Sequence, residues 1–452
     1  MSLRLFVVLV FTFLIFKISV NAGDYNDDNG KKTKLCNELP RQDIEQYLST
    51  KTPYRVVANM DDKPINYKGC HPLRIWSVIR HGTRNPGKKV IARIKTQLKS
   101  LRDHILATKD VELCSKQLES LSKWNFTVSA EEEKYLVAEG EDELIELAER
   151  MQNRFPMLMP EVYNPKRYYF KYTATQRTLK SAQSFATGLF GRNNIGNIDY
   201  PEALHRDPVL RFYKLCSRWK TDVDKNPQTF DNVRKFLQTD HMLDVLKQLR
   251  KKTKLSDIDA PTARLIYTVC AFETAWQRRK EPSVWCQLLD RKSLQILEFI
   301  EDLEYYWNDG YGYELTHQIA CPAIANMFEH IDPLSSLPNA TFYFTHSGTL
   351  LKVLAHLGLY KDEAPLTFQD YGKQRKWRTS AIDAFATNVA FVLYVCENEG
   401  AKVLTLHQEQ VVHIPGCPVD HDLCSLSTLR KLFAHSLDNC NFNEMCFLNE
   451  KI

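Results

Sequence analysis

The sequence predicts an α/β fold into which a mostly helical segment is inserted. Short runs rich in β-branched and aromatic residues, the composition typical of strands, flank a central part of the chain. These runs are residues 73–79, 168–175, 341–345, 389–396 and 402–413. Residues 206–330 instead carry apolar side chains at helical spacing and no convincing strand. We therefore expect residues 23–205 and 331–452 to form one α/β domain, with residues 206–330 as a helical insertion.

The first 22 residues have the layout of a secretory signal peptide. Arg4 precedes an apolar run from Leu5 to Phe16, and Val20-Asn21-Ala22 offers small residues for cleavage before Gly23. The apolar run is short for crossing a bilayer, so a signal anchor is the less favoured alternative. No later stretch of the sequence is long and apolar enough to span a membrane. The sequence thus predicts entry into the secretory pathway and no stable membrane anchor.

The cysteine content agrees with export. The sequence holds 12 cysteines, and an even number in an exported chain indicates disulfide bonds. Cys417 with Cys424, and Cys440 with Cys446, could each close a short local loop. The sequence by itself leaves the pairing open.

Two acceptor sequons for N-linked glycosylation begin at Asn125 and Asn339. They become relevant once the chain enters the secretory pathway. Together with the signal segment and the cysteines, they predict an extracellular protein, or one in the lumen of the endoplasmic reticulum or lysosome.

Charge and motif content exclude several classes of function. The formal net charge of +5 over 452 residues is too small to indicate a nucleic-acid-binding protein. The sequence has no P-loop, no dinucleotide glycine fingerprint and no His-Glu-x-x-His zinc motif. The segment 417–424 lacks a standard zinc spacing, and Thr345-His346-Ser347-Gly348 lacks the first glycine of a serine-nucleophile elbow. We expect no metal and no cofactor.

The segment 80–86, Arg-His-Gly-Thr-Arg-Asn-Pro, is the most informative part of the chain. It directly follows the predicted strand 73–79, which places it at the edge of the sheet where open α/β folds bind ligands. Arg80 and Arg84 can each offer a planar fork of donors to phosphate oxygens. Nearby positive charge lowers the pKa of His81 and keeps its imidazole neutral and nucleophilic. Arg-His-Gly alone would indicate a surface turn; the second arginine and the proline favour a phosphate site.

This segment resembles the Arg-His-Gly-x-Arg-x-Pro motif of the histidine acid phosphatases, and the chain is similar to their multiple inositol polyphosphate phosphatase branch over nearly its whole mature length. Further matching segments are Ala138–Glu141, Tyr172–Ser181, Leu210–Tyr213, Cys270–Glu273 and Gly310–Tyr313. The resemblance implies a phosphoglycerate-mutase-like (histidine phosphatase) sandwich with a mostly helical cap. It also implies hydrolysis of phosphomonoesters of an anionic small molecule, an inositol polyphosphate such as phytate, without a metal.

The resemblance implies a role for each matching residue. His81 would accept the phosphoryl group, forming a phosphohistidine that water later hydrolyses. Arg80, Arg84 and Arg177 would hold the transferring phosphate. Arg177 opens a predicted helix, a position that can also aim backbone N–H groups at an anion. His346, at the end of a predicted strand, would add another group to the phosphate.

Lys89 and Arg93 follow the motif on a predicted helix that begins near Lys88. Four residues apart, they share one side of that helix. Next to a phosphate site they could contact the other phosphates of a polyphosphorylated ring. A solvated basic face is the alternative, and we keep both residues as candidate substrate-binding groups.

The chain departs from the family at the second motif. The branch normally continues as His-Ala-Glu-Thr, and related phosphatases use His-Asp, where the acid protonates the departing alcohol. Here the residues are His346-Ser347-Gly348-Thr349, and Gly348 cannot act as an acid. Three readings stay open: a slower phosphatase in which water or another carboxylate gives the proton, a phosphatase that prefers better leaving groups, or a non-catalytic inositol-phosphate binder. The intact nucleophile and arginines favour the first. Among enzymes, the main alternative substrate assignment is a general acid phosphatase or a bisphosphoglycerate phosphatase.

Overall fold

The structure is a computed structural model that describes residues 25–26, 32–33, 36, 38–278 and 281–447. The predicted signal peptide lies outside the described residues. No helix in the described ranges has the length and apolar character needed to cross a membrane.

A seven-stranded mixed sheet forms the centre of the protein, in the order β4-β5-β3-β6-β7-β8, with β9 paired to β7. The central strand β3 is parallel to β5 on one side and antiparallel to β6 on the other. The strands are β3 (Cys70–Arg80), β4 (Tyr168–Tyr172), β5 (Ala340–Thr345), β6 (Asn388–Cys396), β7 (Gly400–His407), β8 (Gln410–Val411) and β9 (Leu423–Ser425). The strands β1 (Tyr25–Asn26) and β2 (Lys32–Thr33) form a separate two-stranded antiparallel sheet. The predicted α/β fold class is confirmed.

One predicted strand was wrong. The run 402–413 is not continuous, because Gln408 and Glu409 adopt positive φ angles of 50° and 66° and reverse the chain between β7 and β8. Turns of this hand usually carry Gly or Asn, so Gln-Glu gave no signal in the sequence. The Glu409 carboxylate is buried and accepts hydrogen bonds from Arg150 at 2.8 and 2.9 Å and from Arg154. These bonds hold the turn against helix α5 (Ala138–Arg154).

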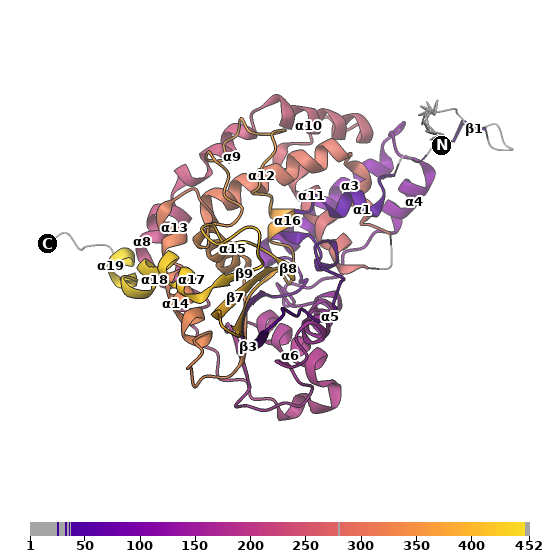
Figure 1. Ribbon diagram of the computed structural model, residues 1–452. Helices are drawn as coiled ribbons and strands as arrows, with labels where there is room; N and C mark the ends of the chain where they lie inside the picture. The colour runs from indigo at the N-terminus through magenta and orange to yellow at the C-terminus, as the bar shows by residue number, and fades with distance from the viewer. Residues whose placement is uncertain (1–24, 27–31, 34–35, 37, 279–280, 448–452) are drawn as a thin grey trace, which may run out of the picture.

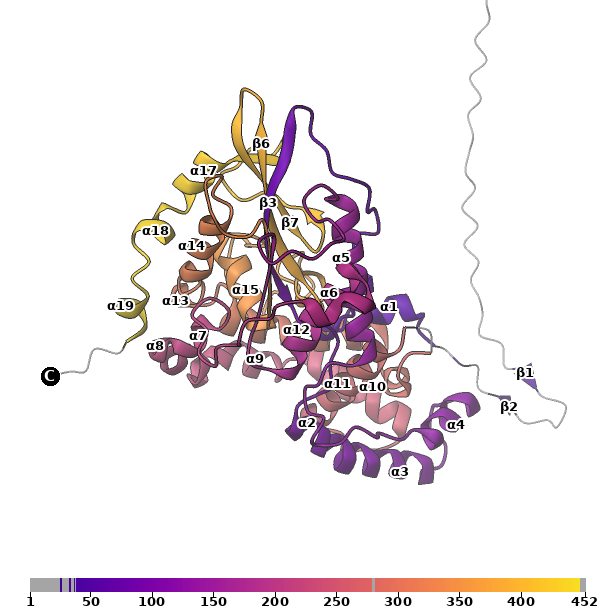
Figure 2. The ribbon, with the colours of Figure 1, turned by 90° about the horizontal axis from the view of Figure 1, so that it is seen from below.

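Helices cover both faces of the sheet, as Figure 2 shows. Side chains alternate along a strand, so Ile75 and Ile79 of β3 pack with α5 and α6, while Trp76 and Val78 pack with α14, α15 and α17 on the other face. The further helices of these layers are α6 (Gln176–Phe190), α7 (Phe212–Leu215), α8 (Ser217–Trp219), α13 (Glu314–Gln318), α14 (Cys321–His330), α15 (Ser347–His356), α17 (Leu426–Leu432), α18 (Ala434–Asp438) and α19 (Phe442–Cys446).

A second group of helices gathers beyond one end of the sheet (Figure 1) around its own apolar cluster. We call it the helical lobe: α1 (Arg41–Glu45), α2 (Lys88–Arg93), the π-helical turn η3 (Ile94–Leu98), α3 (Lys99–Ala107), α4 (Ser115–Lys123), α9 (Asp231–Phe236), α10 (Asp240–Thr253), α11 (Ala260–Trp276), α12 (Arg291–Asp309) and α16 (Thr379–Ile382). The cluster therefore joins helices that precede residue 206 to helices within 206–330. The proposed boundaries of the insertion stay a prediction.

Six disulfide bonds tie the layers together: Cys36–Cys114, Cys70–Cys396, Cys216–Cys446, Cys270–Cys286, Cys321–Cys440 and Cys417–Cys424. The local loop closed by Cys417 and Cys424 agrees with the sequence-based expectation. The suggested Cys440–Cys446 bond was wrong, because Cys440 bonds to Cys321 and Cys446, the last residue of α19, bonds to Cys216. Disulfide bonds of this number are typical of oxidising compartments, which fits a lumenal or extracellular protein.

Candidate active site

The predicted phosphate ligands come together because three neighbouring parallel strands end at the same edge of the sheet. Arg80 is the last residue of β3 and His81 follows it, while His346 follows β5 and caps α15. Arg177 lies in the first turn of α6, just after β4. The His81 N–H donates to the carbonyl of Thr345 at 3.0 Å, and the imidazole rings of His81 and His346 have centroids 5.6 Å apart.

The motif loop is held against α5 by a buried carboxylate. Glu143 accepts hydrogen bonds from the Thr83 N–H at 2.7 Å, the Thr83 hydroxyl at 2.9 Å and the Tyr54 N–H at 2.8 Å. Burial raises the pKa of Glu143 to about 7. A Cβ on Gly82 would lie 2.3 Å from the carbonyl oxygen of Gly140, so the loop and helix approach closely enough to require glycine at both positions.

His81 is arranged as a neutral nucleophile. Its side-chain Nδ1 lies 2.9 Å from the Gly82 carbonyl oxygen, which can only accept, so Nδ1 carries the proton and Nε2 keeps its lone pair. The residue is 3% exposed. Burial lowers the pKa of His81 well below its usual value, and positive charge on Arg177, Arg84 and Arg80 lowers it further. The sequence predicted the charge effect; the structure adds burial as the larger cause.

His346 is also kept neutral. Its Nδ1 accepts from the Arg177 guanidinium at 3.1 Å, and its Nε2 lies 2.9 Å from the Thr173 hydroxyl. Burial, followed by the charges of Arg177 and Arg211, lowers the pKa of His346 well below its usual value. A neutral ring with its proton on Nε2 satisfies both bonds.

The guanidiniums of the site carry unused donors. The Nε atoms of Arg80, Arg177 and Arg211 are buried and have no hydrogen-bond partner among the described residues. Buried donors of this kind are normally satisfied, and an anion between them would accept their hydrogen bonds. Arg84 stands over the Phe272 ring at 5.6 Å, and burial, with the charges of Arg177 and Arg80, lowers its pKa to about 9. The arrangement suits a phosphate group.

Lys89 and Arg93 lie on α2 next to the motif loop, but the structure engages Arg93 elsewhere. Its guanidinium donates to the Pro261 carbonyl at 3.2 Å and to the Gln97 side chain at 3.0 Å. Lys89 is exposed. Their role in substrate binding stays a prediction.

The two sequons differ in their surroundings. Asn125 is exposed. Asn339 is half-buried, and its side-chain amide donates to the Leu73 carbonyl at 3.0 Å immediately before the buried strand β5.

Three residues that the sequence-based prediction missed also lie at this site. Arg211 lies close enough to lower the pKa values of Arg177 and His346. Asp383 accepts a hydrogen bond from the Ser347 hydroxyl, and Asp309 lies 3.0 Å from where a Cβ on Gly348 would be. Arg211 belongs to a segment that matched the family, but no strand precedes it. The two aspartates lie on other elements, so no local pattern connects them to the motif.

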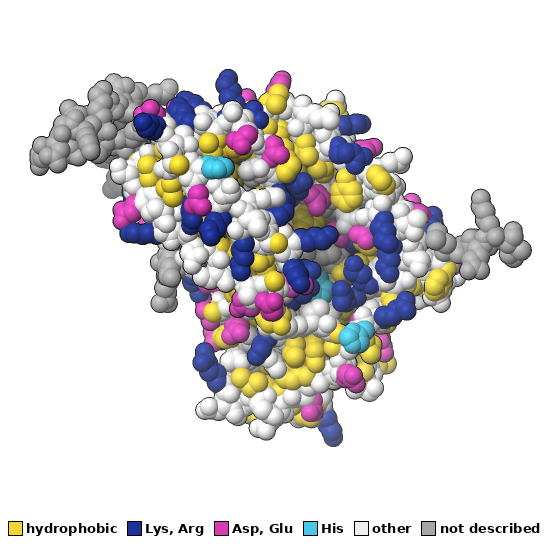
Figure 3. All heavy atoms as spheres, turned by 180° about the vertical axis from the view of Figure 1, so that it is seen from behind, with side chains coloured by type: hydrophobic (Ala, Val, Ile, Leu, Met, Phe, Trp, Pro, Cys, Tyr) yellow, Lys and Arg dark blue, Asp and Glu magenta, His cyan; other side chains and the backbone are white. Residues whose placement is uncertain are grey.

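One face of the molecule is hollowed near its centre, with Lys and Arg side chains gathered around the hollow and a histidine visible within it (Figure 3). A basic cleft of this kind concentrates anions.

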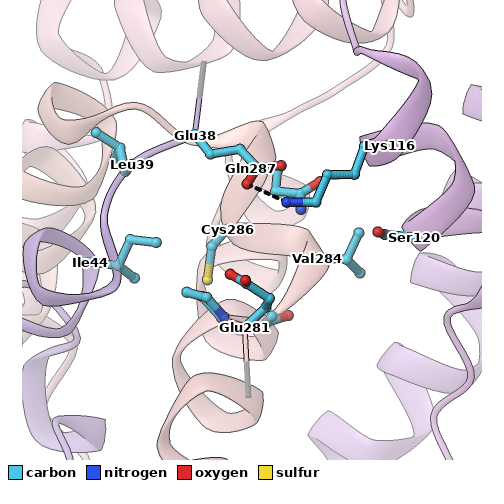
Figure 4. Close-up of a pocket in the computed structure, with 11 residues that line it drawn as sticks. Glu38, Leu39, Ile44, Lys116, Ser120, Glu281, Val284, Cys286 and Gln287 are labelled. Carbon is cyan, nitrogen blue, oxygen red and sulfur yellow. Dashed lines mark hydrogen bonds and ion pairs between the residues drawn. The ribbon is translucent and has the colours of Figure 1, made fainter. Parts of the chain in front are cut away.

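A separate pocket of about 170 Å³ lies beside α4 and is bordered by Glu38, whose carboxylate is 3.1 Å from Lys116 Nζ (Figure 4). Cys36, Glu38 and Cys114 have the spacing of metal ligands, but the two sulfur atoms are bonded to each other.

Sequence comparisons identify relatives along most of the chain. The profile of the histidine phosphatase superfamily (branch 2) matches residues 75–411. Multiple inositol polyphosphate phosphatase 1 of Drosophila melanogaster is 32% identical over 399 residues, which cover 84% of this chain and 83% of that protein. The human protein of the same name is 28% identical over 446 residues, covering 90% of this chain and 89% of its own.

Solved structures share the fold. The phytase from D. castellii superposes with a TM-score of 0.74 at 15% identity, covering 89% of this chain and 87% of the phytase. The multiple inositol polyphosphate phosphatase of Bifidobacterium longum, solved in complex with inositol hexasulfate, gives a TM-score of 0.67 at 16% identity, with 87% and 98% of the two chains covered. These similarities confirm the predicted histidine phosphatase architecture.

Proposed function

Since the chain belongs to the histidine phosphatase superfamily (branch 2), whose members hydrolyse phosphomonoesters, we propose that its substrates are inositol polyphosphates and that His81 attacks them. Its relatives are named phosphatases, so the protein is a phosphoric monoester hydrolase. The substrate class is proposed from the names of the relatives that cover most of the chain, and from the charge of the site.

The observation that carries this proposal is the state of His81. A buried imidazole with a free Nε2 lone pair stands beside three arginines, two of which have an unpaired Nε. Because burial and charge lower its pKa, His81 stays neutral in mildly acidic medium, where an ordinary histidine would take a proton. The arginines would stabilise charge on the phosphoryl oxygens as it passes to the imidazole.

The reaction would run in two displacements. His81 Nε2 forms a bond to phosphorus while the bond from phosphorus to the alcohol oxygen breaks, giving a phosphohistidine. Water then attacks phosphorus and the phosphorus–nitrogen bond breaks, which releases inorganic phosphate. Arg80, Arg84 and Arg177 would hold the three non-bridging oxygens through both steps, and His346 would orient Arg177 through their hydrogen bond.

The remaining phosphates of an inositol ring would lie in the basic cleft outside the site. Lys89, exposed on α2, is available for such a contact, whereas Arg93 would have to leave Pro261 and Gln97. The predicted leader and the disulfide bonds support action of the enzyme after export, outside the cell or in a lumen.

The test measures phosphate release from phytate and from p-nitrophenyl phosphate by the wild type and by His81→Ala. We expect the wild type to hydrolyse both substrates, and His81→Ala to lose at least about 10⁴-fold in kcat/KM, because the second imidazole of the site, His346, has both ring nitrogens in hydrogen bonds. Equal activity of the two proteins would rule out His81 as the nucleophile. Saturable binding of phytate without turnover of either substrate would identify a binder instead of an enzyme.

A further inference from the structure

The site lacks a side chain at Gly348, where the family places its acid, yet one carboxylate lies beside Gly348 and a second contacts its neighbour Ser347. Gly348 stands in the first turn of α15. Asp309, at the end of α12, fills the space beside it, and Asp383, just after α16, contacts the preceding residue, Ser347. An alkoxide is a poor leaving group unless it is protonated, so a donor near Ser347 decides whether the enzyme can cleave inositol phosphates.

Asp383 is joined to the phosphate site from two sides. The Ser347 hydroxyl donates to Asp383 Oδ2, and Arg80 lies 3.4 Å from the same oxygen. Arg80 also donates to the backbone carbonyl of Asp383, so the arginine keeps one bond to this residue whatever the charge of the carboxyl. Beyond Asp383, Phe385 lies under the Arg80 guanidinium at 4.7 Å, and the Ala386 N–H donates to the His81 carbonyl at 3.1 Å.

Asp383 and Ser347 differ in their exposure to solvent. Asp383 is fully buried, and its Oδ1 has no hydrogen-bond partner among the described residues. Ser347 is only half-buried and directly follows His346 at the edge of the sheet. When Asp383 is protonated, the bond reverses: its carboxyl donates to the Ser347 hydroxyl, which is then able to donate its own proton into the cleft.

We propose that Ser347 is the catalytic proton donor to the departing alcohol and that Asp383, behind it, supplies the proton. This inference rests on the proposed function and replaces the acid that is absent at Gly348. When Nε2 of His81 bonds to phosphorus and the phosphorus–oxygen bond breaks, the alcohol oxygen takes the Ser347 hydroxyl proton. Ser347 takes the proton of Asp383, which becomes a carboxylate. In the second step the attacking water returns a proton through Ser347 to Asp383.

The surroundings of Asp383 allow it to hold a proton. Burial raises its pKa to about 6, the charge of Arg80 and the bond from Ser347 oppose the rise, and the negative charge of Asp309 adds to it. These are the charged and hydrogen-bonding groups that face it from β3, α15 and α12. The acid would therefore be protonated in mildly acidic medium, where His81 is still neutral, so both groups are ready at the same pH.

Asp309 is less suited to the role. One of its oxygens accepts from the fully buried Lys352, and the other accepts from the Asn308 amide at 3.0 Å. Lys352 is fully buried and packs over the rings of Tyr213 and Trp219. Asp309 is thus the counter-ion of a buried cation, and both of its oxygens are already engaged in hydrogen bonds.

The experiment compares kcat/KM for two leaving groups, because only an alcohol needs the proton. Asp383→Asn and Ser347→Ala should lose about 100-fold or more on phytate and less than about 10-fold on p-nitrophenyl phosphate, whose phenolate departs unaided. Ser347→Thr, which keeps the hydroxyl, should retain most activity on phytate. In the wild type, kcat/KM on phytate should fall as pH rises through about 6. The pH profile of Asp383→Asn should lack this decrease.

Other outcomes would overturn the inference. Equal losses on the two substrates in Asp383→Asn would show that Asp383 only positions Arg80. Full activity of Ser347→Ala on phytate would exclude the hydroxyl. A loss confined to phytate in the double variant Asp309→Asn/Lys352→Met, with Asp383→Asn active, would assign the acid to Asp309. Absence of His81-dependent turnover of either substrate by the wild type would instead refute the proposed function itself. Thermal melting of each variant checks that it is folded.

Discussion

His81 and His346 are held neutral by the same guanidiniums, and Arg177 is common to both. It ranks directly after burial among the causes that lower the pKa of each imidazole. One arginine therefore serves two purposes, since it offers donors to the phosphate and sets the protonation state of the nucleophile.

Replacing Arg177 should change both properties. We expect Arg177→Ala to lose about 10²- to 10³-fold in kcat/KM for p-nitrophenyl phosphate, the usual effect of removing one donor to a transition-state oxyanion. Because a repulsive charge is removed, the pKa of His81 should rise, and the acidic limb of the pH–rate profile should move to higher pH. Arg177→Lys keeps the charge and should leave that limb near its wild-type position. An unmoved limb in Arg177→Ala would contradict this account.

Single residues of the site were predictable where each directly followed a strand. His81 and His346 follow strands that were visible as β-branched and aromatic runs, and the double-arginine motif made their chemistry specific. Asp383 and Arg211 were not predictable, because each enters through an irregular segment whose path depends on tertiary packing. The absence of an acid at Gly348 was visible in the sequence, but the groups that surround it were not.

At the level of elements, the contact between the motif loop and α5 is set by two glycines. A Cβ on Gly140 would lie 2.2 Å from the Thr83 carbonyl oxygen, and a Cβ on Gly82 would clash with Gly140 in return. Backbone faces backbone in both directions, so no flexible side chain can move away. The Glu143 bonds to Thr83 and Tyr54 depend on this close approach.

Gly82→Ala should therefore force the loop away from α5. We expect a loss of about 1–3 kcal/mol in the free energy of unfolding, the usual cost of overpacking, together with a reduced kcat. Chemical denaturation gives the first quantity and p-nitrophenyl phosphate turnover the second. Gly196→Ala is the matched control, because nothing lies within 4 Å of its Cβ position and it should change neither measurement. A Gly82→Ala protein as stable and active as the control would refute the packing argument.

Elements were predictable in type more than in extent. The five longest strands of the sheet were found from their apolar and aromatic runs, and α6 and α12 from their helical periodicity, whereas the short strand β9 was not predicted. The turn between β7 and β8 was missed, since its positive φ angles fall on Gln408 and Glu409. What stabilises that turn is a buried ion pair with α5, a contact between residues more than 250 positions apart.

For the whole molecule, the disulfide bonds differ greatly in the length of chain that they close. Cys417–Cys424 spans 7 residues, whereas Cys216–Cys446 spans 230. Because the entropy removed from the unfolded chain grows with loop length, Cys216→Ser/Cys446→Ser should lose roughly 2–3 kcal/mol more stability than Cys417→Ser/Cys424→Ser. Equilibrium denaturation of the two double variants measures this difference. Equal stability of the two would argue against a role of the long loop.

Glycosylation should also follow the fold. We expect the secreted protein to carry a glycan at exposed Asn125 and none at Asn339. A glycan on Asn339 would displace the amide hydrogen bond to Leu73 and crowd the start of β5, so chains modified there should fail to complete the sheet. Mass spectrometry of glycopeptides from protein secreted by a eukaryotic host measures both sites. Full occupancy of Asn339 in active protein would contradict this expectation.

The pairing of β3 with β6 also determines when the sheet can form during synthesis of the chain. A ribosome adds about 5–20 residues per second, and the Cys70–Cys396 link joins positions 326 residues apart, so β3 must wait roughly 15–65 seconds for β6 to be synthesised. The helices of the lobe up to α12 emerge well before that time. Until then the nascent chain holds a half-built sheet with an apolar central strand, and we expect chaperones to bind it. Because β6 pairs with β3 up to Ile79, two residues before His81, we expect fragments that end before β6 to lack an ordered site.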